Sequence, residues 1–447
     1  EDSITLRFNW HAAISADPFD TKTIYYASQY LHKSTDRGEN WEIISPDLTT
    51  NNPEYQKQDS SGGLTFDATG AENFTTILAI APSPLDEKMI WVTTDDGNIQ
   101  LTTDDGQSWE NKTGSLGGAA SGSWIPQIRP STYNESECYV VVNDYRRNNW
   151  EPYILYTDNK GDSWTNVLEG KNIGSFVRSF IQDPIEPNLM FLGTEFGLYI
   201  TFNQGKDWQK WTEGYPNVPT LDMQIQEREN DLVIGTFGRA AWIFDDISAF
   251  REVARNGAKV LEKPLTLFPV NTGYLVSTKQ PAGTRFGGKS IYDGTNERMG
   301  VRFTFNIKKP EKKKGKKEDK DEDEEEETAD KKKDNKPSKD SLAIRIYDMT
   351  GAEVRTLFMK VDTSIQRYYW GFETNGVRNP GQKKPEKETT PSAGFPVLPG
   401  KYKAVLTYMN TTDSAEFEVK YDPRVEHNLN DIKAVNKVYK ELESIIE

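Results

Sequence analysis

The sequence predicts an all-β protein, in which a β-propeller of about five blades is followed by an antiparallel β-sandwich and a short C-terminal helix. Three observations predict this order. An eight-residue pattern occurs four times before residue 210, short alternating apolar strands precede each copy, and longer alternating strands begin after residue 264. Regular repetition of one short pattern is the sequence signature of a repeat architecture, and short strands separated by turn residues are typical of propeller blades.

The repeated pattern reads Ser/Thr-x-Asp/Asn-x-Gly-x-x-Trp. Its acidic or amide side chain can accept hydrogen bonds from its own turn, its glycine supplies a positive φ, and its tryptophan buries a large ring between neighbouring sheets. We therefore expect a structural role for these residues, in the turn between the third and fourth strands of each blade. They are Asp36, Gly38, Trp41, Asp104, Gly106, Trp109, Asn159, Gly161, Trp164, Asn203, Gly205 and Trp208.

Longer units surround the pattern. Residues 76–109 and 176–208 each contain short strands broken by Pro, Asp and Gly, as expected for a four-stranded antiparallel blade. A fifth unit, 221–247, has the first strands of a blade but no copy of the pattern. Successive copies lie 68, 55 and 44 residues apart, and we interpret 45–73 in the longest gap as an insertion loop. Five units are compatible both with a closed five-bladed ring and with part of a larger ring. The abrupt start of the chain favours the larger ring.

Four segments are expected along the chain. They are a propeller over 1–247, a helical linker over 248–264, a β-sandwich over 265–425, and an amphipathic helix over 426–447 that must pack on a partner surface. Residues 308–340 interrupt the sandwich with 13 Lys and 13 Asp and Glu. This charged stretch has no apolar content to bury, so we expect it to be a disordered loop.

Charge and composition exclude several classes of function. The net charge of −15 argues against a nucleic-acid backbone or an anionic membrane surface as the main partner. Cys138 is the single cysteine, so no intrachain disulfide can form. No apolar run approaches the roughly 18 residues of a membrane span, so we expect no membrane insertion. Because the chain opens on Glu1 without a signal peptide, we expect a processed segment or a fragment of a longer protein.

Metal and cofactor sites are not expected. The three histidines, His11, His32 and His427, are scattered through the sequence without metal-ligand spacing. Neither a phosphate-binding loop nor a dinucleotide-binding loop occurs in the sequence. We therefore predict no metal and no cofactor.

Several longer runs carry a family resemblance. They include 7–10, 25–30, 45–49, 82–86, 91–97, 193–197 and 235–246, with 346–357 and 397–402 in the C-terminal part. These runs resemble the large bacterial BNR-repeat, sortilin-type β-propeller proteins, which are often labelled glycosyl hydrolases and whose repeated turn is called the Asp-box. Members are typically much longer, so the chain resembles their C-terminal part. The family usually has a histidine where this chain has Phe237.

This resemblance also implies a location. It suggests a protein of the Bacteroidota that is secreted, periplasmic or on the cell surface, in association with the Gram-negative outer membrane. An outer-membrane complex is then a candidate assembly for the chain.

The best candidate binding surface lies on the hairpins between the second and third strands. In a closed propeller these hairpins converge near the central channel, on the face opposite the repeated turns. The candidate residues are Asp95, Asp96, Asn143, Asp144, Tyr145, Arg146, Arg147, Glu195, Phe237 and Arg239. The alternative interpretation is that Asp-Gly and Glu-Phe-Gly are simply the residues that tight turns require.

A non-catalytic extracellular scaffold is the function we favour. Glycoside hydrolysis needs two carboxylates about 5–10 Å apart, one of them with a raised pKa. The available carboxylates offer no diagnostic spacing, so we name no catalytic residue. They are Asp95, Asp96, Asp144 and Glu195. The expected partner is a protein, a missing N-terminal part of the same protein, or a glycan. One alternative is the C-terminal half of a glycoside hydrolase with its cleft on the propeller face. An aromatic-lined cleft between two propellers would support it, and an absence of aromatic residues beside Asp95 and Glu195 would count against it. The other is a sortilin-like peptide receptor.

Overall fold

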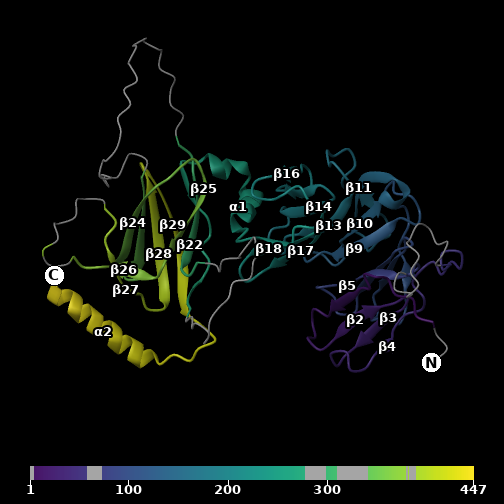
Figure 1. Cartoon of the computed structure of the whole chain (residues 1–447), viewed down its shortest axis with the longest axis horizontal. Helices are drawn as coiled ribbons and strands as arrows, with labels where there is room; N and C mark the ends of the chain where they lie inside the picture. Colours follow the sequence, from purple (N-terminus) through teal and green to yellow (C-terminus); the bar gives the residue numbers. More distant parts are fainter. Residues whose placement is uncertain are drawn as a thin grey trace, which may run out of the picture. The chain divides into compact units, whose positions relative to one another are not determined.

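The computed structural model describes residues 5–57, 73–276, 298–309, 341–378, 381 and 389–446 (Figure 1). The chain divides into two compact units, Glu1–Arg255 and Asn256–Glu447. Except for Lys308 and Lys309, the expected charged loop at 308–340 lies outside the described residues, and so does 58–72 of the insertion loop.

The first unit consists of five antiparallel sheets in chain order, which is the arrangement of propeller blades. Blade 1 contains β1 (Ile14–Ala16), β2 (Ile24–Ala27), β3 (Leu31–Ser34) and β4 (Glu42–Ile43). Blade 2 contains β5 (Ile77–Pro82), β6 (Ile90–Thr94), β7 (Ile99–Thr102) and β8 (Glu110–Asn111). Blade 3 contains β9 (Trp124–Pro130), β10 (Cys138–Asp144), β11 (Asn149–Thr157) and β12 (Thr165–Asn166).

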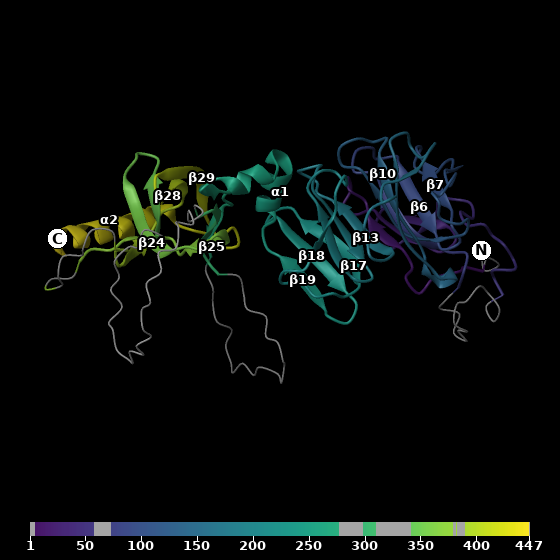
Figure 2. The ribbon, with the colours of Figure 1, turned by 90° about the horizontal axis from the view of Figure 1, so that it is seen from above.

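The last two blades complete this unit. Blade 4 contains β13 (Val177–Gln182), β14 (Met190–Thr194), β15 (Gly197–Thr201) and β16 (Gln209–Trp211). Blade 5 contains β17 (Thr220–Gln226), β18 (Asp231–Thr236) and β19 (Ala241–Phe244), which lie side by side in Figure 2. The fold expected from the sequence is thus confirmed, with four four-stranded blades and a fifth of three strands.

Each blade packs on the next through side chains that alternate along its strands. In β6, Ile90 and Val92 join a buried cluster shared with blade 1, whereas Trp91 between them joins the cluster shared with blade 3. Successive side chains of a strand point to opposite faces of the sheet. A strand that is apolar at every position can therefore hold two neighbouring blades at once.

The four repeated turns lie between the third and fourth strands of blades 1 to 4 and share one set of contacts. In the first, Ser34 Oγ and the Asn40 backbone N–H donate to Asp36 Oδ1 at 2.8 and 2.9 Å. The Gly38 N–H donates to Ser34 Oγ at 2.8 Å. The other three copies repeat all three bonds. The four glycines have φ between +76° and +92°, a region that strains other residues.

Helix α1 (Ser248–Asn256) packs against blade 4 and belongs mainly to the first unit, although the sequence suggested a linker from residue 248. The Phe250 ring meets Phe202 edge-on with centroids 6.0 Å apart. Arg251 Nη2 lies 2.9 Å from Asp183 Oδ2, and both side chains are buried. A 3₁₀ turn, Ala258–Glu262, follows the helix.

The second unit is a β-sandwich. One sheet has the order β20 (Leu265–Leu267), β22 (Val301–Ile307), β25 (Ser364–Trp370). The other has the order β21 (Gly273–Leu275), β29 (Thr411–Tyr421), β28 (Gly400–Tyr408), β23 (Ser341–Asp348), β24 (Glu353–Lys360). β26 (Glu373–Asn375) and β27 (Ala393–Pro396) form a separate hairpin. A single core draws Phe303 and Phe305 from one sheet and Ile344 and Leu406 from the other.

Helix α2 (Leu429–Ile446) ends the chain with only part of its apolar stripe in contact. Tyr439 stacks on Phe395 with ring centroids 4.3 Å apart. Val435, Val438, Leu442 and Ile445 of the same helix are exposed. Neither this helix nor α1 is long and apolar enough to cross a membrane.

Candidate binding groove

The inner strands of the first unit line a groove of about 940 Å³. All five blades contribute to its wall, with β1, β5, β9 and β17 supplying strand residues and β13 supplying Arg178. Five of the residues expected at the binding surface also line it, at the end of β10 or in the loops that follow the second strands. They are Asn143, Tyr145, Arg146, Glu195 and Phe237. The groove is therefore the place where these distant loops converge.

Aromatic rings hold the guanidinium of Arg146 in this groove. Arg146 lies in a short 3₁₀ turn, Tyr145–Arg147, with its Cζ 3.6 Å from the ring centre of Trp124 and 4.6 Å from that of Tyr145. Trp124 also stacks on Phe74, with centroids 6.4 Å apart. Desolvation of Arg146 lowers its pKa and the charge of Arg178 lowers it further, whereas Tyr145 and the carboxyl of Asp95 oppose the shift. No carboxylate of the described chain lies within ion-pair distance of Arg146.

A second guanidinium nearby carries its own counterion. Arg178 Nε lies 2.5 Å from Glu195 Oε2. Its Cζ is 4.9 Å from the Phe176 ring and 5.5 Å from the Tyr145 ring, and these two rings stack with centroids 4.7 Å apart. The carboxylate of Glu195 is thus neutralised within the groove. Tyr145 was among the residues expected at the binding surface, whereas Phe176 and Arg178 were not.

Asn143 is an unpartnered polar side chain in the wall of the groove. It is 3% exposed, and its Oδ1 has no hydrogen-bond partner in the described chain. Leaving a buried acceptor unsatisfied costs about 1–3 kcal/mol. A ligand that presents a hydroxyl or an N–H group to Asn143 would recover that energy.

Polar side chains also join the inner strands to one another. Arg129 Nη2 of β9 lies 3.4 Å from Asp222 Oδ1 of β17 and donates to the Met223 carbonyl at 3.2 Å. The Phe180 N–H of β13 donates to Gln127 Oε1 at 2.7 Å. These contacts fix the width of the groove between blades 3, 4 and 5.

Asp95 and Asp96 were expected at the binding surface, and the structure corrects that expectation. They are only 1% and 2% exposed and do not line the groove. The Thr76 N–H and Oγ1 donate to Asp95 at 2.8 and 2.6 Å, and Thr50 N–H and Oγ1 donate to Asp96 at 2.8 and 2.6 Å. Burial raises the pKa of Asp95 to about 8, although the bonds from Thr76 oppose that shift.

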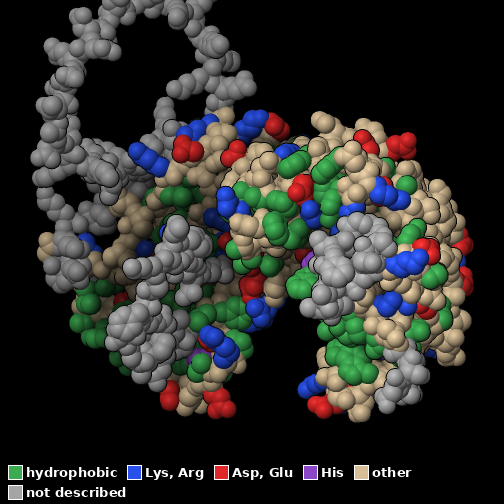
Figure 3. Space-filling view, turned by 45° about the vertical axis from the view of Figure 1, so that its right-hand side comes forward, with side chains coloured by type: hydrophobic (Ala, Val, Ile, Leu, Met, Phe, Trp, Pro, Cys, Tyr) green, Lys and Arg blue, Asp and Glu red, His purple; other side chains and the backbone are tan. Residues whose placement is uncertain are grey.

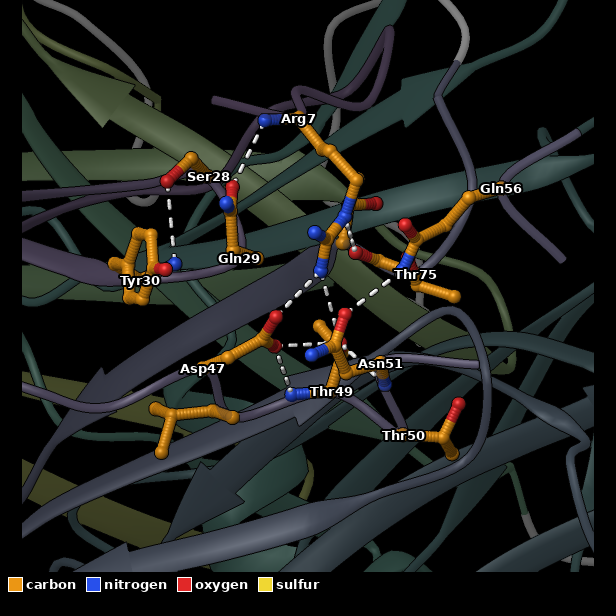
Figure 4. Close-up of polar contacts among 12 residues, drawn as sticks. Arg7, Ser28, Gln29, Tyr30, Asp47, Thr49, Thr50, Asn51, Gln56 and Thr75 are labelled. Atoms are coloured by element: carbon orange, nitrogen blue, oxygen red, sulfur yellow. Dashed lines mark hydrogen bonds and ion pairs between the residues drawn. The ribbon is translucent and has the colours of Figure 1, made fainter. Parts of the chain in front are cut away.

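The segment before blade 1 contributes to covering Asp95, and the insertion loop contributes to covering Asp96. Arg7 Nη2 lies 2.7 Å from Asp47 Oδ2, and Arg7 Nε donates to the Thr75 carbonyl at 3.1 Å (Figure 4). Two residues later, Asn9 Nδ2 donates to Asp95 at 3.3 Å. The ion pair of Arg7 therefore holds both the N-terminal segment and the insertion loop over the second blade.

The remaining predicted residues lie outside the groove. Asp144 is buried and pairs with Arg147 at 2.5 Å. Arg147 also donates to the Ser121 carbonyl and to Ser123 Oγ, which makes it part of the loop framework. Arg239 is exposed and does not line the groove.

Sequence reasoning missed the groove residues that come from inner strands. Trp124, Gln127, Arg129 and Arg178 belong to the first strand of their blades. The first strand of a propeller blade lies nearest the central axis. Polar and aromatic residues in the first strands were therefore the sequence feature from which these groove residues could have been predicted.

The described ranges contain no group of three or more His, Cys, Asp and Glu side chains that could hold a metal ion. His11 lines the groove without such neighbours. Cys138 is fully buried, and burial raises the pKa of its thiol. On the face shown in Figure 3, Lys and Arg side chains are interspersed with Asp and Glu rather than gathered in one basic patch.

Solved structures overlap with this chain only partly. A GH74 xyloglucanase from Xanthomonas campestris is 16% identical with a TM-score of 0.40, over 52% of this chain and 36% of that one. A GH74 enzyme from Niastella koreensis is 16% identical with a TM-score of 0.39, over 53% and 36%. A structure named as the extracellular domain of a hybrid two-component system from B. thetaiotaomicron is 13% identical with a TM-score of 0.36, over 93% and 44%.

The matched region spans little more than a third of the length of the two GH74 structures. At these TM-scores the overlaps identify neither a substrate nor an activity. No family profile matches the chain, and no curated protein matches its sequence.

Proposed function

We propose that this chain is a non-catalytic extracellular scaffold whose propeller groove binds a protein or glycan partner within a larger assembly. The observation that carries the proposal is the pairing of the groove's acidic groups. The two carboxylates among its described lining residues, Glu195 and Asp222, each face an arginine, Arg178 and Arg129 respectively. Such a surface is suited to recognition, because its charges are already held in fixed positions.

Hydrolysis of a glycosidic bond would make different demands on the groove. It needs a protonated carboxylic acid that can reach the substrate, together with a second carboxylate at about 5–10 Å. Burial raises the pKa of Asp95 to about 8, as a general acid requires, but that carboxyl is enclosed by Thr76 and Asn9. Glu195 is ion-paired with Arg178. These contacts favour binding over hydrolysis.

The ends of the blade series support the part of the proposal that concerns an assembly. Large apolar side chains that do not line the groove are exposed at both ends of the series. They are Trp10, Trp41 and Ile43 in or next to blade 1 and Ile243 in blade 5. Exposed apolar groups of this kind favour coverage by a partner protein or by a preceding segment of the same protein.

A pair of matched variants tests the proposed groove. Ala16 is exposed and lines the groove, whereas Ala241 is exposed on β19 and does not. Partners would be sought by calorimetry against neutral and acidic oligosaccharides and against proteins retained by the immobilised full chain. We expect Ala16→Tyr to abolish binding of the partner and Ala241→Tyr to leave it unchanged.

Two results would contradict the proposal. If Ala16→Tyr and Ala241→Tyr had equal effects on binding of the partner, the binding site would lie outside the groove. Release of reducing ends from a bound oligosaccharide, measured by chromatography, would instead make the chain a glycoside hydrolase.

A further inference from the structure

Among the described residues that line the groove, one positive charge has no ion-pair partner. Among the described lining residues the arginines are Arg129, Arg146 and Arg178, and the carboxylates are Asp222 and Glu195. Arg129 faces Asp222 at 3.4 Å and Arg178 faces Glu195 at 2.5 Å. Arg146 is therefore the remaining cation, within a chain whose net charge is −15.

The side chains around Arg146 favour the binding of an anion to its guanidinium. Its guanidinium lies 3.6 Å from the Trp124 ring centre, which fixes its plane and removes water from one face. Arg178 lies close enough to disfavour the charged form of Arg146. A carboxylate bound to the Arg146 guanidinium would relieve that repulsion, and such charge-assisted bonds are the strong ones.

The unpartnered amide of Asn143 adds a second requirement for the ligand. Asn143 is 3% exposed and lines the same groove, and its Oδ1 lacks a donor in the described chain. The amide can accept from a hydroxyl while its own N–H groups donate to another. A ligand that suits this end of the groove thus carries both a carboxylate and hydroxyl groups.

The groove wall favours a sugar over a peptide. An extended peptide would have to add to the edge of an inner strand through backbone hydrogen bonds. Pro82 of β5 and Pro126 and Pro130 of β9 line the groove and have no N–H to offer. The Phe180 N–H of β13 is already bonded to Gln127. Recognition at β5 and β9 therefore depends mainly on side chains, and Phe237, which is 69% exposed, presents an apolar ring for a pyranose face.

We propose that Asn143, Arg146 and Arg178 form a subsite for the uronate unit of an acidic oligosaccharide. This inference rests on the proposed function, because it names the ligand class of the same groove. Arg146 binds the carboxylate, and Asn143 binds a ring hydroxyl. The ion pair of Arg178 and Glu195 supplies a further donor and acceptor.

The test compares tetragalacturonate with its methyl ester, which has the same sugar units without the charge. Calorimetry with the full chain is expected to give at least tenfold tighter binding of the free acid. Arg146→Gln should remove this preference, and Arg146→Lys should retain most of it. Arg239→Gln, which changes an exposed arginine outside the groove, should leave it unchanged. Affinity for the acid should also fall as salt is raised.

Failure of the inference can be told apart from failure of the proposed function. Equal binding of acid and ester, blocked by Ala16→Tyr, would overturn the uronate subsite and leave the groove as a binding site. Binding of a polyglutamate peptide in place of tetragalacturonate would also overturn the subsite. Binding of any partner that Ala16→Tyr does not affect would overturn the groove itself. Near-ultraviolet circular dichroism of Arg146→Gln shows whether the variant keeps its fold.

Discussion

Trp164 Nε1 donates a hydrogen bond to the backbone carbonyl of Lys112 at 2.7 Å, and this bond joins blade 3 to the end of blade 2. The previous repeat has the same relationship, because Trp109 Nε1 donates to the Ile44 carbonyl at the end of blade 1 at 3.1 Å. In blade 1, Trp41 bonds the Gly38 carbonyl of its own turn and stays 43% exposed. The repeated tryptophan thus hydrogen-bonds the preceding blade in blades 2 and 3, whereas Trp208 Nε1 of blade 4 has no hydrogen-bond partner in the described chain.

This difference predicts unequal effects for one substitution. Trp164→Phe removes the bond to Lys112 and leaves a carbonyl unpaired beside a buried ring, so it should cost about 1–3 kcal/mol of unfolding free energy. Trp41→Phe, at an exposed position, should cost less than about 1 kcal/mol. Urea denaturation of both variants measures the difference, and equal losses would show that the inter-blade bond contributes little.

The glycines of the repeated turns differ in the space around them. A Cβ on Gly161 would lie 2.9 Å from Lys112 Cβ and 3.2 Å from Trp91, whereas a Cβ on Gly205 would meet nothing nearer than 3.5 Å. Both have positive φ, which costs a non-glycine residue about 1–2 kcal/mol. Because of its closer contacts, Gly161→Ala should lose about 1–3 kcal/mol more unfolding free energy than Gly205→Ala, through overpacking. Thermal denaturation would contradict this if Gly205→Ala were the less stable variant.

The ion pair between α1 and blade 4 should be a large contributor to stability. Arg251 and Asp183 are both buried and lie 2.9 Å apart. Asp183→Asn would leave a buried guanidinium without its counterion, at a cost of about 3–5 kcal/mol. Glu54→Gln, which breaks the exposed pair with Lys57, should cost about 1 kcal/mol or less. A loss below 1 kcal/mol for Asp183→Asn, measured by urea denaturation, would mean that water reaches the pair.

Asp95 should make stability depend on pH in a specific direction. Burial raises its pKa from 3.8 to about 8 in the folded chain. Between these values the unfolded state releases a proton that the folded state keeps, so raising the pH favours unfolding. The contribution of Asp95 to the free energy of unfolding is thus fully present below about pH 4 and is lost as the pH rises through 8.

Asp95→Asn removes this titration while Thr76 can still bond the side chain. The difference in unfolding free energy between the variant and the parent chain should therefore grow in favour of the variant from pH 5 to pH 8. Urea denaturation at several pH values measures it. Parallel pH profiles for the two proteins would show that Asp95 does not titrate in this range.

The sequence predicted local features better than long-range ones. The turn around Asp36 depends on residues within four positions, so its place between strands followed from the pattern. Arg146 was predicted from its position in the turn after the second strand of a blade, and it lines the groove. The burial of Asp95 and Asp96 could not be foreseen, since the residues that cover them, Asn9 and Thr50, lie 86 and 46 positions away.

Hydrogen–deuterium exchange with a bound partner tests the central claim, that the groove is the binding site, most directly. We expect slower exchange in the inner strands β1, β5 and β9 and in the loop that contains Arg146 when the partner is added. Exchange in the outer strands β4 and β8 should not change. Protection confined to the outer strands or to the sandwich, with none in the groove, would contradict the proposed function.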